Sequence, residues 1–507
     1  MGADTIAFHA LHTPDKPAVI IGGDAEVLSY AALNARSNQG AHVLRNAGLR
    51  IGDALAVCIE NALPFFHVTC AALRSGLTVV PVSANLTAKE IAFIVADSGA
   101  KALVTSPGIG EAFERVPALL SGITLFTTGT AMAGYRAWDA EADLKPIEPI
   151  ADECPGTEMF YSSGTTGRPK GIRYLGTPDG QGDGSGRIVR ISRMLGLNRE
   201  SVYLSPAPLY HSGPFTWSMG MLRLGGTVIV MKKFDPQEAL ALIEHYRINV
   251  SQWVPTHFVR LLKLPDTVRK LYDLSSLRLA IHAAAPCPVP VKQAMIDWWG
   301  PILLEYFGSS EQTALTIIDS VEWLAHPGSV GTCRLGALHI CDDEGEPVAA
   351  RTVGQVYSEG GMNFVYHNDP EKTAESRNRH GWTTVGDLGY LDDEGYLYLT
   401  DRKNFMIISG GVNVYPQEIE NLLVTHPRIA DAAVIGTPDA DLGEKVTAII
   451  QPADMSDATA DFAEEVKAWL RQSLSGVKVP KRIEFREHMP RLPTGKMVKH
   501  ILRKEYS

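Results

Sequence analysis

Strands and helices alternate from Ala54 onward, and this alternation limits the fold more than any other feature of the sequence. Apolar, strand-like segments at 54–60, 77–82 and 101–105 are separated by two helix-like segments. The second of these opens with Thr87 and Glu90 in a capping-box pattern, and apolar residues then recur at helical spacing. Such alternation favours parallel strands joined by helices, so we expect an α/β fold with doubly wound sheets.

The chain has 507 residues, which is more than one hydrophobic core usually serves. Near its end Pro416 opens a helix-like segment, and a second apolar helical pattern covers 462–470. We therefore expect a large N-terminal domain of several subdomains at 1–400. A small, mobile α/β C-terminal domain is expected at 401–507, with the hinge at Asp401.

Charge and hydropathy exclude several classes of protein. The formal net charge of −10 argues against a broad surface for nucleic acid or anionic lipid. No run of about 18 apolar residues could span a bilayer, and the N-terminus lacks the pattern of a signal peptide. We expect a cytoplasmic protein with neither a nucleic-acid partner nor a membrane span.

A loop rich in glycine and hydroxyl side chains is the most informative segment for chemistry. Residues 161–171 read YSSGTTGRPKG. Glycines let backbone N–H groups converge on an anion, hydroxyls add donors, and Lys170 adds a positive charge, so the loop suits a polyphosphate. The spacing is not that of a Walker A loop, and Pro169 disfavours a helix starting at Lys170.

The segment resembles the phosphate loop of the adenylate-forming superfamily, which includes acyl-CoA synthetases, aryl-CoA ligases, luciferases and peptide-synthetase adenylation domains. Further motifs follow in the family's order at 208–211 (PLYH), 283–286 (AAAP) and 307–311 (FGSSE). This resemblance implies that Phe307 stacks on adenine, Ser310 contacts the α-phosphate region and Glu311 ligates magnesium. The implied nucleotide-binding residues of these segments are Ser162, Ser163, Gly164, Thr165, Thr166, Gly167, Lys170, Ala284, Phe307, Gly308 and Ser310.

Later motifs continue the same resemblance. Residues 381–387 (GWTTVGD) end in Asp387, which the family match assigns to the ribose hydroxyls, and Arg402 matches the second ribose contact. Gly410 and Gly411 resemble the glycine turn that lets the pantetheine of coenzyme A approach. Lys496 matches the C-terminal lysine that enters the active site during adenylation.

The chemistry of adenylation explains the implied catalytic set. A carboxylate is repelled by the triphosphate that it must attack, so a cation between the two stabilises the transition state. The resemblance assigns catalysis to Lys496, Glu311, Thr166 and His211, and magnesium binding to Glu311 and Thr166. The implied ligands are ATP, Mg²⁺ and coenzyme A, the last as co-substrate.

The acyl pocket is expected to be apolar. The positions that map to it contain no Lys or Arg to pair a second carboxylate and no Asp for an amino group: His211, Phe215, Trp217, Val254, His282, Ala284, Gly308 and Ser309. We expect a fatty, aromatic or alicyclic monocarboxylic acid. The predicted function is an AMP-forming acyl-CoA ligase of the fatty acid or 4-coumarate type.

Alternatives remain at this point. They are a stand-alone adenylation enzyme that loads a carrier protein, a luciferase-like oxidase, and a nucleotide-sensing protein without turnover; a homodimer is also left open. The chain departs from the family pattern at Ala283-Ala284, at Val385, and at Asn404-Phe405, where the family commonly has a Lys-acid pair. The last departure bears on contacts made when the small domain rotates.

Overall fold

The computed structural model describes residues 5–24, 26–162, 169–176, 185–491 and 497–506. Its N-terminal part holds a six-stranded sheet in the order β7-β6-β5-β3-β4-β8, and all of its pairings are parallel. The strands are β3 (Ala54–Cys58), β4 (Thr78–Pro81), β5 (Ala100–Thr105), β6 (Thr124–Thr127), β7 (Arg136–Ala137) and β8 (Thr157–Glu158). The helices are α2 (Tyr30–Asn46), α3 (Leu63–Arg74), α4 (Ala88–Asp97), α5 (Ala112–Arg115) and α6 (Trp138–Asp143).

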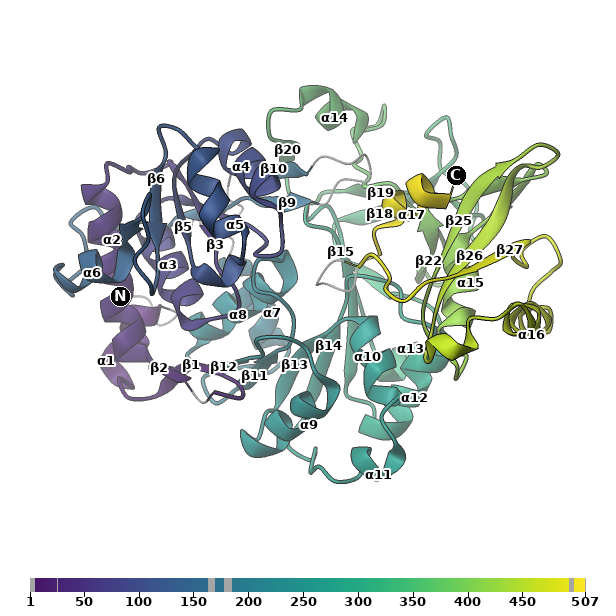
Figure 1. The fold of residues 1–507 in the computed structure, drawn as a ribbon, viewed down its shortest axis with the longest axis horizontal. Helices are drawn as coiled ribbons and strands as arrows, with labels where there is room; N and C mark the ends of the chain where they lie inside the picture. Colours follow the sequence, from purple (N-terminus) through teal and green to yellow (C-terminus); the bar gives the residue numbers. More distant parts are fainter. Residues whose placement is uncertain (1–4, 25, 163–168, 177–184, 492–496, 507) are drawn as a thin grey trace.

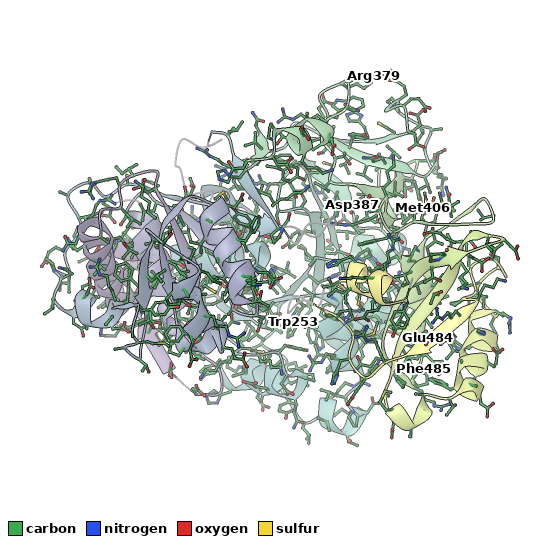
Figure 2. All side chains as sticks on the ribbon, turned by 45° about the horizontal axis from the view of Figure 1, so that its top comes forward. Trp253, Arg379, Asp387, Met406, Glu484 and Phe485 are labelled. Carbon is green, nitrogen blue, oxygen red and sulfur yellow. The ribbon has the colours of Figure 1, made fainter. Side chains whose placement is uncertain are left out.

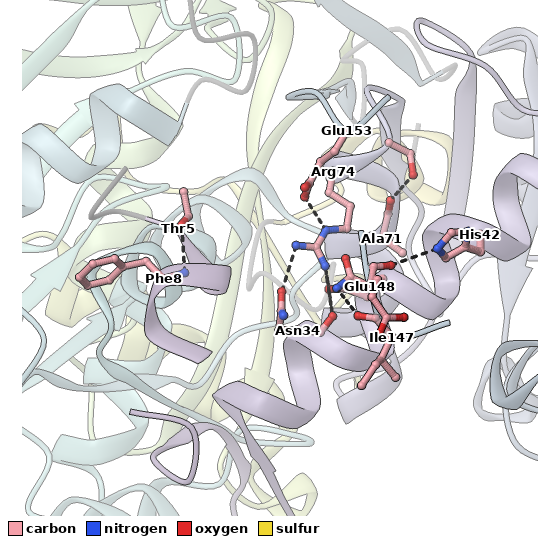
Figure 3. Close-up of polar contacts among 12 residues, drawn as sticks. Thr5, Phe8, Asn34, His42, Ala71, Arg74, Ile147, Glu148 and Glu153 are labelled. Atoms are coloured by element: carbon pink, nitrogen blue, oxygen red, sulfur yellow. Dashed lines mark hydrogen bonds and ion pairs between the residues drawn. The ribbon is translucent and has the colours of Figure 1, made fainter. Parts of the chain in front are cut away.

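This sheet confirms the strand–helix alternation expected from the sequence. Parallel β3, β4 and β5 are joined through α3 and α4, and α4 starts at the expected capping box of Thr87 and Glu90. Polar contacts join α2 and α3 to each other and to residues 148–153, which precede β8 (Figure 3). Arg74 on α3 donates to Asn34 on α2 at 3.0 Å and to Glu153 at 2.9 Å, and a ring nitrogen of His42 lies 3.0 Å from the Glu148 carbonyl oxygen.

A nine-stranded sheet follows, in the order β17-β16-β15-β14-β13-β11-β12-β1-β2. Its central strands are parallel, whereas β2, β16 and β17 pair antiparallel. The strands are β1 (Pro17–Ile21), β2 (Glu26–Ser29), β11 (Val202–Ser205), β12 (Thr227–Val230), β13 (Val250–Trp253), β14 (Leu279–His282), β15 (Leu303–Gly308), β16 (Leu315–Asp319) and β17 (Thr332–Leu335). The helices are α1 (Ile6–His12), α7 (Ser185–Met194), α8 (Ser212–Leu224), α9 (Pro236–His245), α10 (Pro255–Leu262), α11 (Asp266–Arg269), α12 (Val289–Trp299) and α13 (Ser320–Ala325).

The two large sheets share one hydrophobic core. Side chains of α2, α3 and α8 fill the space between them, whereas α9, α10 and α12 cover the other face of the nine-stranded sheet. Figure 1 shows the sheets side by side, in purple to blue and in teal. This arrangement confirms the expected doubly wound architecture of the large domain.

Two small sheets complete the N-terminal part. One has the order β20-β10-β9, with β9 (Phe160–Ser162), β10 (Lys170–Tyr174) and β20 (Phe364–Tyr366). The other has the order β18-β19-β21-β22, with β18 (Ala337–Cys341), β19 (Gly354–Glu359), β21 (Asp387–Leu391) and β22 (Leu397–Arg402). Helix α14 (Pro370–Glu375) follows β20.

The C-terminal domain, in yellow-green in Figure 1, is smaller and has its own core. Its strands are β23 (Ile407–Ser409), β24 (Val412–Val414), β25 (Ile429–Asp439), β26 (Gly443–Pro452) and β27 (Arg482–Phe485). Its helices are α15 (Pro416–Leu423), α16 (Ala460–Leu470) and α17 (Lys499–Tyr506), of which the first two were expected from the sequence. A helix long and apolar enough to cross a membrane is not found in the described ranges.

Candidate active site

A cavity of about 730 Å³ lies between the nine-stranded sheet and the C-terminal domain. Each parallel strand near it contributes residues that follow its carboxyl end: Pro206 after β11, Lys232 after β12, Val254 after β13, Ala284 after β14 and Ser309 after β15. Ligands of open α/β sheets bind at this edge, because the strand ends and their loops converge there. The fold therefore assembles the predicted motifs around one space.

The end of β15 carries the predicted adenine and magnesium motif. Phe307 and Gly308 line the cavity, and Glu311 beyond them is only 7% exposed. The hydroxyl of Tyr366 on β20 donates to Glu311 Oε1 at 2.9 Å. Burial and the carboxylate of Glu311 both raise the pKa of Tyr366, so its hydroxyl keeps the proton that it donates. One oxygen of Glu311 is thus held in place by a neutral donor.

Ser310 is positioned through both its side chain and its backbone. Its Oγ lies 3.3 Å from Ser212 Oγ at the start of α8, and its carbonyl oxygen accepts a hydrogen bond from the Tyr174 hydroxyl on β10. Gln312 Nε2 in turn donates to that hydroxyl at 2.9 Å. Helix α8 and strand β10 therefore hold the segment that the sequence assigns to the α-phosphate region.

Ala284 occupies a backbone conformation that favours glycine. Its φ is +79°, in the left-handed region, where a Cβ costs roughly 1–2 kcal/mol. The residue lines the cavity in the turn after β14. This strain explains why a glycine at this position is the usual family choice, and it shows that the turn is retained here in spite of the substitution.

The two predicted ribose ligands form an ion pair at the cavity wall. Asp387 begins β21 and Arg402 ends β22, and the antiparallel register places the two residues opposite each other. Arg402 Nε lies 3.0 Å from Asp387 Oδ1, and both residues line the cavity. Figure 2 shows Asp387 where the green sheet approaches the C-terminal domain. A carboxylate acceptor beside a guanidinium donor is the chemistry that a vicinal diol requires.

The predicted phosphate loop is described only at its two ends. Ser162 on β9 pairs with Lys170 on β10, so a hairpin closes at these residues. Lys170 Nζ lies 5.6 Å from the ring centroid of Tyr366, the residue that holds Glu311, and 3.8 Å from Asp369 Oδ2. The predicted residues Ser163, Gly164, Thr165, Thr166 and Gly167 lie outside the described residues.

Half of the expected acyl-pocket residues line the cavity. Val254, Ala284, Gly308 and Ser309 do so, whereas His211, Phe215, Trp217 and His282 are not among its described lining residues. Phe215 packs edge to face on Phe65 and Phe160 in the shared core. His211 precedes α8 with its ring centroid 4.4 Å from that of Tyr210, and His282 is fully buried at the end of β14.

Sequence reasoning found Asp387 and Arg402 but missed other charged groups of the cavity. Lys232, Lys233 and Arg260 line it, and so does Glu305. The lysines lie two and three residues after the end of β12, so the strand-end rule was the signal that could have found them. The Arg260 guanidinium carbon lies 4.8 Å above the ring centroid of Phe234. This wall of the cavity is therefore positively charged, and one of its cations stacks on an aromatic ring.

Glu305, at the cavity wall, belongs to a buried ion pair. Its Oε2 lies 2.6 Å from Nζ of Lys292 on α12, and both side chains are almost completely buried. Burial raises the pKa of Glu305, while the charge of Lys292 opposes that shift. His282, 3.7 Å from the same oxygen, has its pKa lowered far below the usual value by burial and by Lys292, so it stays neutral. Lys292 is therefore the cation that balances Glu305.

The C-terminal domain forms the opposite wall of the cavity. Its lining residues include members of α15 and β25, and Arg491 and Met497, which flank the segment 492–496. The predicted catalytic Lys496 lies within that segment and outside the described residues. Lys263, which follows α10 of the large domain, donates to the carbonyl oxygens of Ile429 and Ala430. This contact joins the two domains in the present orientation.

The glycine turn predicted to admit pantetheine does not border the cavity in this orientation of the C-terminal domain. Gly410 and Gly411 connect β23 and β24 with φ of +57° and +79°, are exposed, and are not among the described residues that line the cavity. Phe405, at the family's Lys-acid position, does line it, and Lys499 Nζ lies 5.0 Å from its ring centroid. In this orientation the cavity thus meets Phe405 and the flanks of Lys496, and the glycine turn lies outside it.

Known proteins resemble the chain over its whole length. A feruloyl-CoA synthase of Amycolatopsis sp is 33% identical over 504 residues, covering 97% of this chain and 96% of the relative. The fatty acid–acyl-carrier-protein ligase ScoC of Streptomyces coeruleorubidus is 31% identical, covering 99% and 96%. The crystal structure of ATP-bound MatB from Rhodopseudomonas palustris superposes with a TM-score of 0.82 at 28% identity, covering 100% of this chain and 99% of that one.

Family models match both domains. The model of the AMP-binding enzyme matches residues 7–365, and the model of the AMP-binding enzyme C-terminal domain matches residues 418–496. The first alone covers more than half of the chain, and it contains Phe307 and Glu311. The protein therefore belongs to the family of AMP-binding enzymes, in its adenylate-forming, acyl-CoA ligase group.

Proposed function

We propose that the protein joins an apolar monocarboxylic acid to coenzyme A with ATP, through an enzyme-bound acyl-adenylate, and releases AMP and pyrophosphate. The observation that carries the proposal is that one cavity is bordered by the Asp387–Arg402 pair, by Phe307 and by the residues on both sides of segment 492–496. Ribose, adenine and a C-terminal cation can thus meet at one place. Ligation of an acid to coenzyme A also agrees with the names of the curated relatives, which include a feruloyl-CoA synthase and two CoA ligases.

The first half-reaction follows from the charges around the cavity. Phe307 offers a ring face to adenine, and Asp387 accepts hydrogen bonds from the ribose hydroxyls while Arg402 holds its carboxylate. A carboxylate oxygen of the acid forms a bond to the α-phosphorus, and the bond to the bridging oxygen breaks, so pyrophosphate leaves. Lys496 would neutralise the charge that develops between carboxylate and phosphate.

Glu311 is suited to hold a magnesium ion with the phosphates. Within the described part of the chain, no group of three or more His, Cys, Asp or Glu side chains is arranged for a metal. Mg²⁺ commonly takes only one or two carboxylates from a protein when substrate phosphates supply other oxygen ligands. Glu311, buried and held by Tyr366 on one oxygen, fits that pattern, and Thr166 would be its partner. The bound ion would stabilise the leaving pyrophosphate.

In the second half-reaction the thiol of coenzyme A attacks the acyl carbonyl carbon. A carbon–sulfur bond forms, the bond to the AMP oxygen breaks, and the thiol proton is released. Lys232, Lys233 and Arg260 at the cavity wall provide cations for the phosphates of coenzyme A. We expect Gly410 and Gly411 to reach the cavity only after the C-terminal domain turns about Asp401, since the present orientation leaves them outside.

A carrier-protein thiol is the competing acceptor, because ScoC is named as a carrier-protein ligase. Turnover with free coenzyme A at kcat/KM comparable to that of adenylation would exclude a need for the carrier. A luciferase-like oxidase would consume oxygen, and a nucleotide sensor would release no pyrophosphate. We also expect a cytoplasmic location, which cell fractionation would check.

The uncharged residues Val254, Ala284, Gly308 and Ser309 at the cavity predict the class of acid. Apolar monocarboxylic acids of medium or larger size should exceed acetate, dicarboxylates and amino acids in kcat/KM, because each buried methylene contributes about 0.8 kcal/mol. A coupled assay for AMP over such a panel measures this. Acetate or an amino acid as the best substrate would show that these residues do not form the acyl pocket.

Replacement of Glu311 by glutamine should lower magnesium-dependent kcat by at least tenfold and leave the fold intact, because the change removes a charged ligand at nearly constant volume. Turnover against Mg²⁺ concentration and thermal melting should be measured together. Glu344→Gln, at an exposed position, is the matched control. A large loss of stability with normal turnover would assign Glu311 a structural role instead.

A further inference from the structure

Tyr306, which the sequence analysis did not assign to any role, lines the cavity directly before Phe307 on β15. We propose that its ring closes the inner end of the acyl pocket and sets the longest acid that the enzyme accepts. This inference rests on the proposed function, and it adds an upper size limit to the class of acid given there.

Strand geometry directs the ring toward α8. Neighbouring residues of a strand point to opposite faces of the sheet, and Glu305 reaches Lys292 on α12. Tyr306 must therefore point to the other face, where its ring centroid lies 6.4 Å from that of Trp217 on α8. This is the face on which α8 begins beside Ser310. The ring thus stands between the cavity and the shared core.

Hydrogen bonds hold the ring in that place. Gln252 Nε2 on β13 donates to the Tyr306 hydroxyl at 3.2 Å, and the Tyr203 hydroxyl donates to Gln252 Oε1 at 3.2 Å. Burial raises the pKa of both tyrosines, so both hydroxyls stay protonated. A chain of neutral donors and acceptors across three strands leaves the phenol little freedom to move aside.

The first turn of α8 packs closely on the same group. A Cβ added at Gly213 would lie 2.7 Å from Gln252 Nε2 and 3.4 Å from the Tyr306 hydroxyl oxygen. The space between α8 and β13 is therefore filled by the phenol and its partner amide, and an acyl chain entering past Gly308 meets the ring. Removing the ring would extend the pocket toward Trp217 and Gln252.

The test is the dependence of kcat/KM on chain length for straight-chain acids, measured on the unaltered protein, Tyr306→Ala and Tyr306→Phe. In the unaltered protein kcat/KM should rise by roughly fourfold per methylene, the equivalent of about 0.8 kcal/mol, and then fall at a limiting length. Tyr306→Ala should move that limit by two or more methylenes to longer acids and leave the KM for ATP unchanged. Tyr306→Phe, which keeps the ring and loses the hydrogen bond, should keep the original limit.

An unchanged limit in Tyr306→Ala, with adenylation of short acids retained, would overturn the proposal. Tyr306→Leu provides a second variant that fills part of the space, and its limit should lie between those of the tyrosine and alanine forms. Equal limits for Tyr306→Leu and the unaltered protein would also count against the ring as the barrier. A failure of the unaltered protein to form AMP with every acid would instead reject the proposed function.

Discussion

Replacing Lys496 by alanine is expected to slow acyl-adenylate formation by about a hundredfold or more, the loss typical of removing one charged contact to a transition state. Its neighbour Met497 and the nearby Arg491 line the cavity, which supports adenylation in the present orientation. Given preformed acyl-adenylate, the same variant should form thioester at nearly the normal rate. Single-turnover assays of each half-reaction measure both rates, with Lys481→Ala as an exposed control in the same domain.

The hinge variant should show the opposite pattern. Asp401 Oδ2 accepts a hydrogen bond from the backbone N–H of Gln417 at 3.0 Å, at the start of α15, so this residue connects β22 to the C-terminal domain. Asp401→Pro restricts φ there and should impair thioester formation while adenylation is retained. Asp401→Ala loses the side-chain contact but leaves φ free, so it separates the two effects. Equal loss of both half-reactions in Lys496→Ala and Asp401→Pro would contradict an alternating C-terminal domain.

Replacing Lys292 by methionine should lower the free energy of unfolding by about 3–5 kcal/mol, because Glu305 would remain buried without its cation. The 2.6 Å ion pair and its near-complete burial are the reasons. Denaturant unfolding at pH 7 measures the loss. The double variant Lys292→Met with Glu305→Gln should recover much of it, since neither charge is then left unpaired.

The pH dependence of the stability deficit in Lys292→Met is a second test of the Lys292–Glu305 pair. The pKa of Glu305 is already raised by burial, and losing Lys292 should raise it further. A carboxyl with a raised pKa in the folded state stabilises the fold below its unfolded pKa, and that contribution is lost as the pH rises through the folded pKa. The deficit of Lys292→Met should therefore shrink toward acidic pH. A deficit that is independent of pH, or no recovery in the double variant, would show that the pair is not the cause.

Local patterns predicted much of the fold. The alternation after Ala54, the capping box at Thr87 and the helix at Pro416 depend on residues close in sequence, and the structure contains all three. The antiparallel edge strands of the nine-stranded sheet were not predicted, because their pairing depends on distant segments. The sequence of a short edge strand does not indicate which strand it pairs with.

The same limit applies to the site: residues in recognisable motifs could be predicted, whereas residues defined by contacts between distant elements could not. Asp387 and Arg402 could be predicted because each belongs to a recognisable motif, and β21 and β22 bring them together. Phe215 could not be separated from a pocket residue, since an apolar side chain has the same sequence signal in a core and in a pocket. Tyr306 and Lys263 depend on contacts across elements, with Gln252 and with the C-terminal domain.

The most direct test of the proposed ligase activity is the product stoichiometry with ATP, Mg²⁺, coenzyme A and a panel of apolar acids such as hexanoic, decanoic, benzoic and cinnamic acid. Chromatography of nucleotides and thioesters in one reaction measures all products together. We expect AMP, pyrophosphate and one acyl-CoA in equal amounts, and acyl-AMP when coenzyme A is omitted. Formation of ADP and phosphate with the thioester, or pyrophosphate release that needs no acid, would contradict an adenylate-forming ligase.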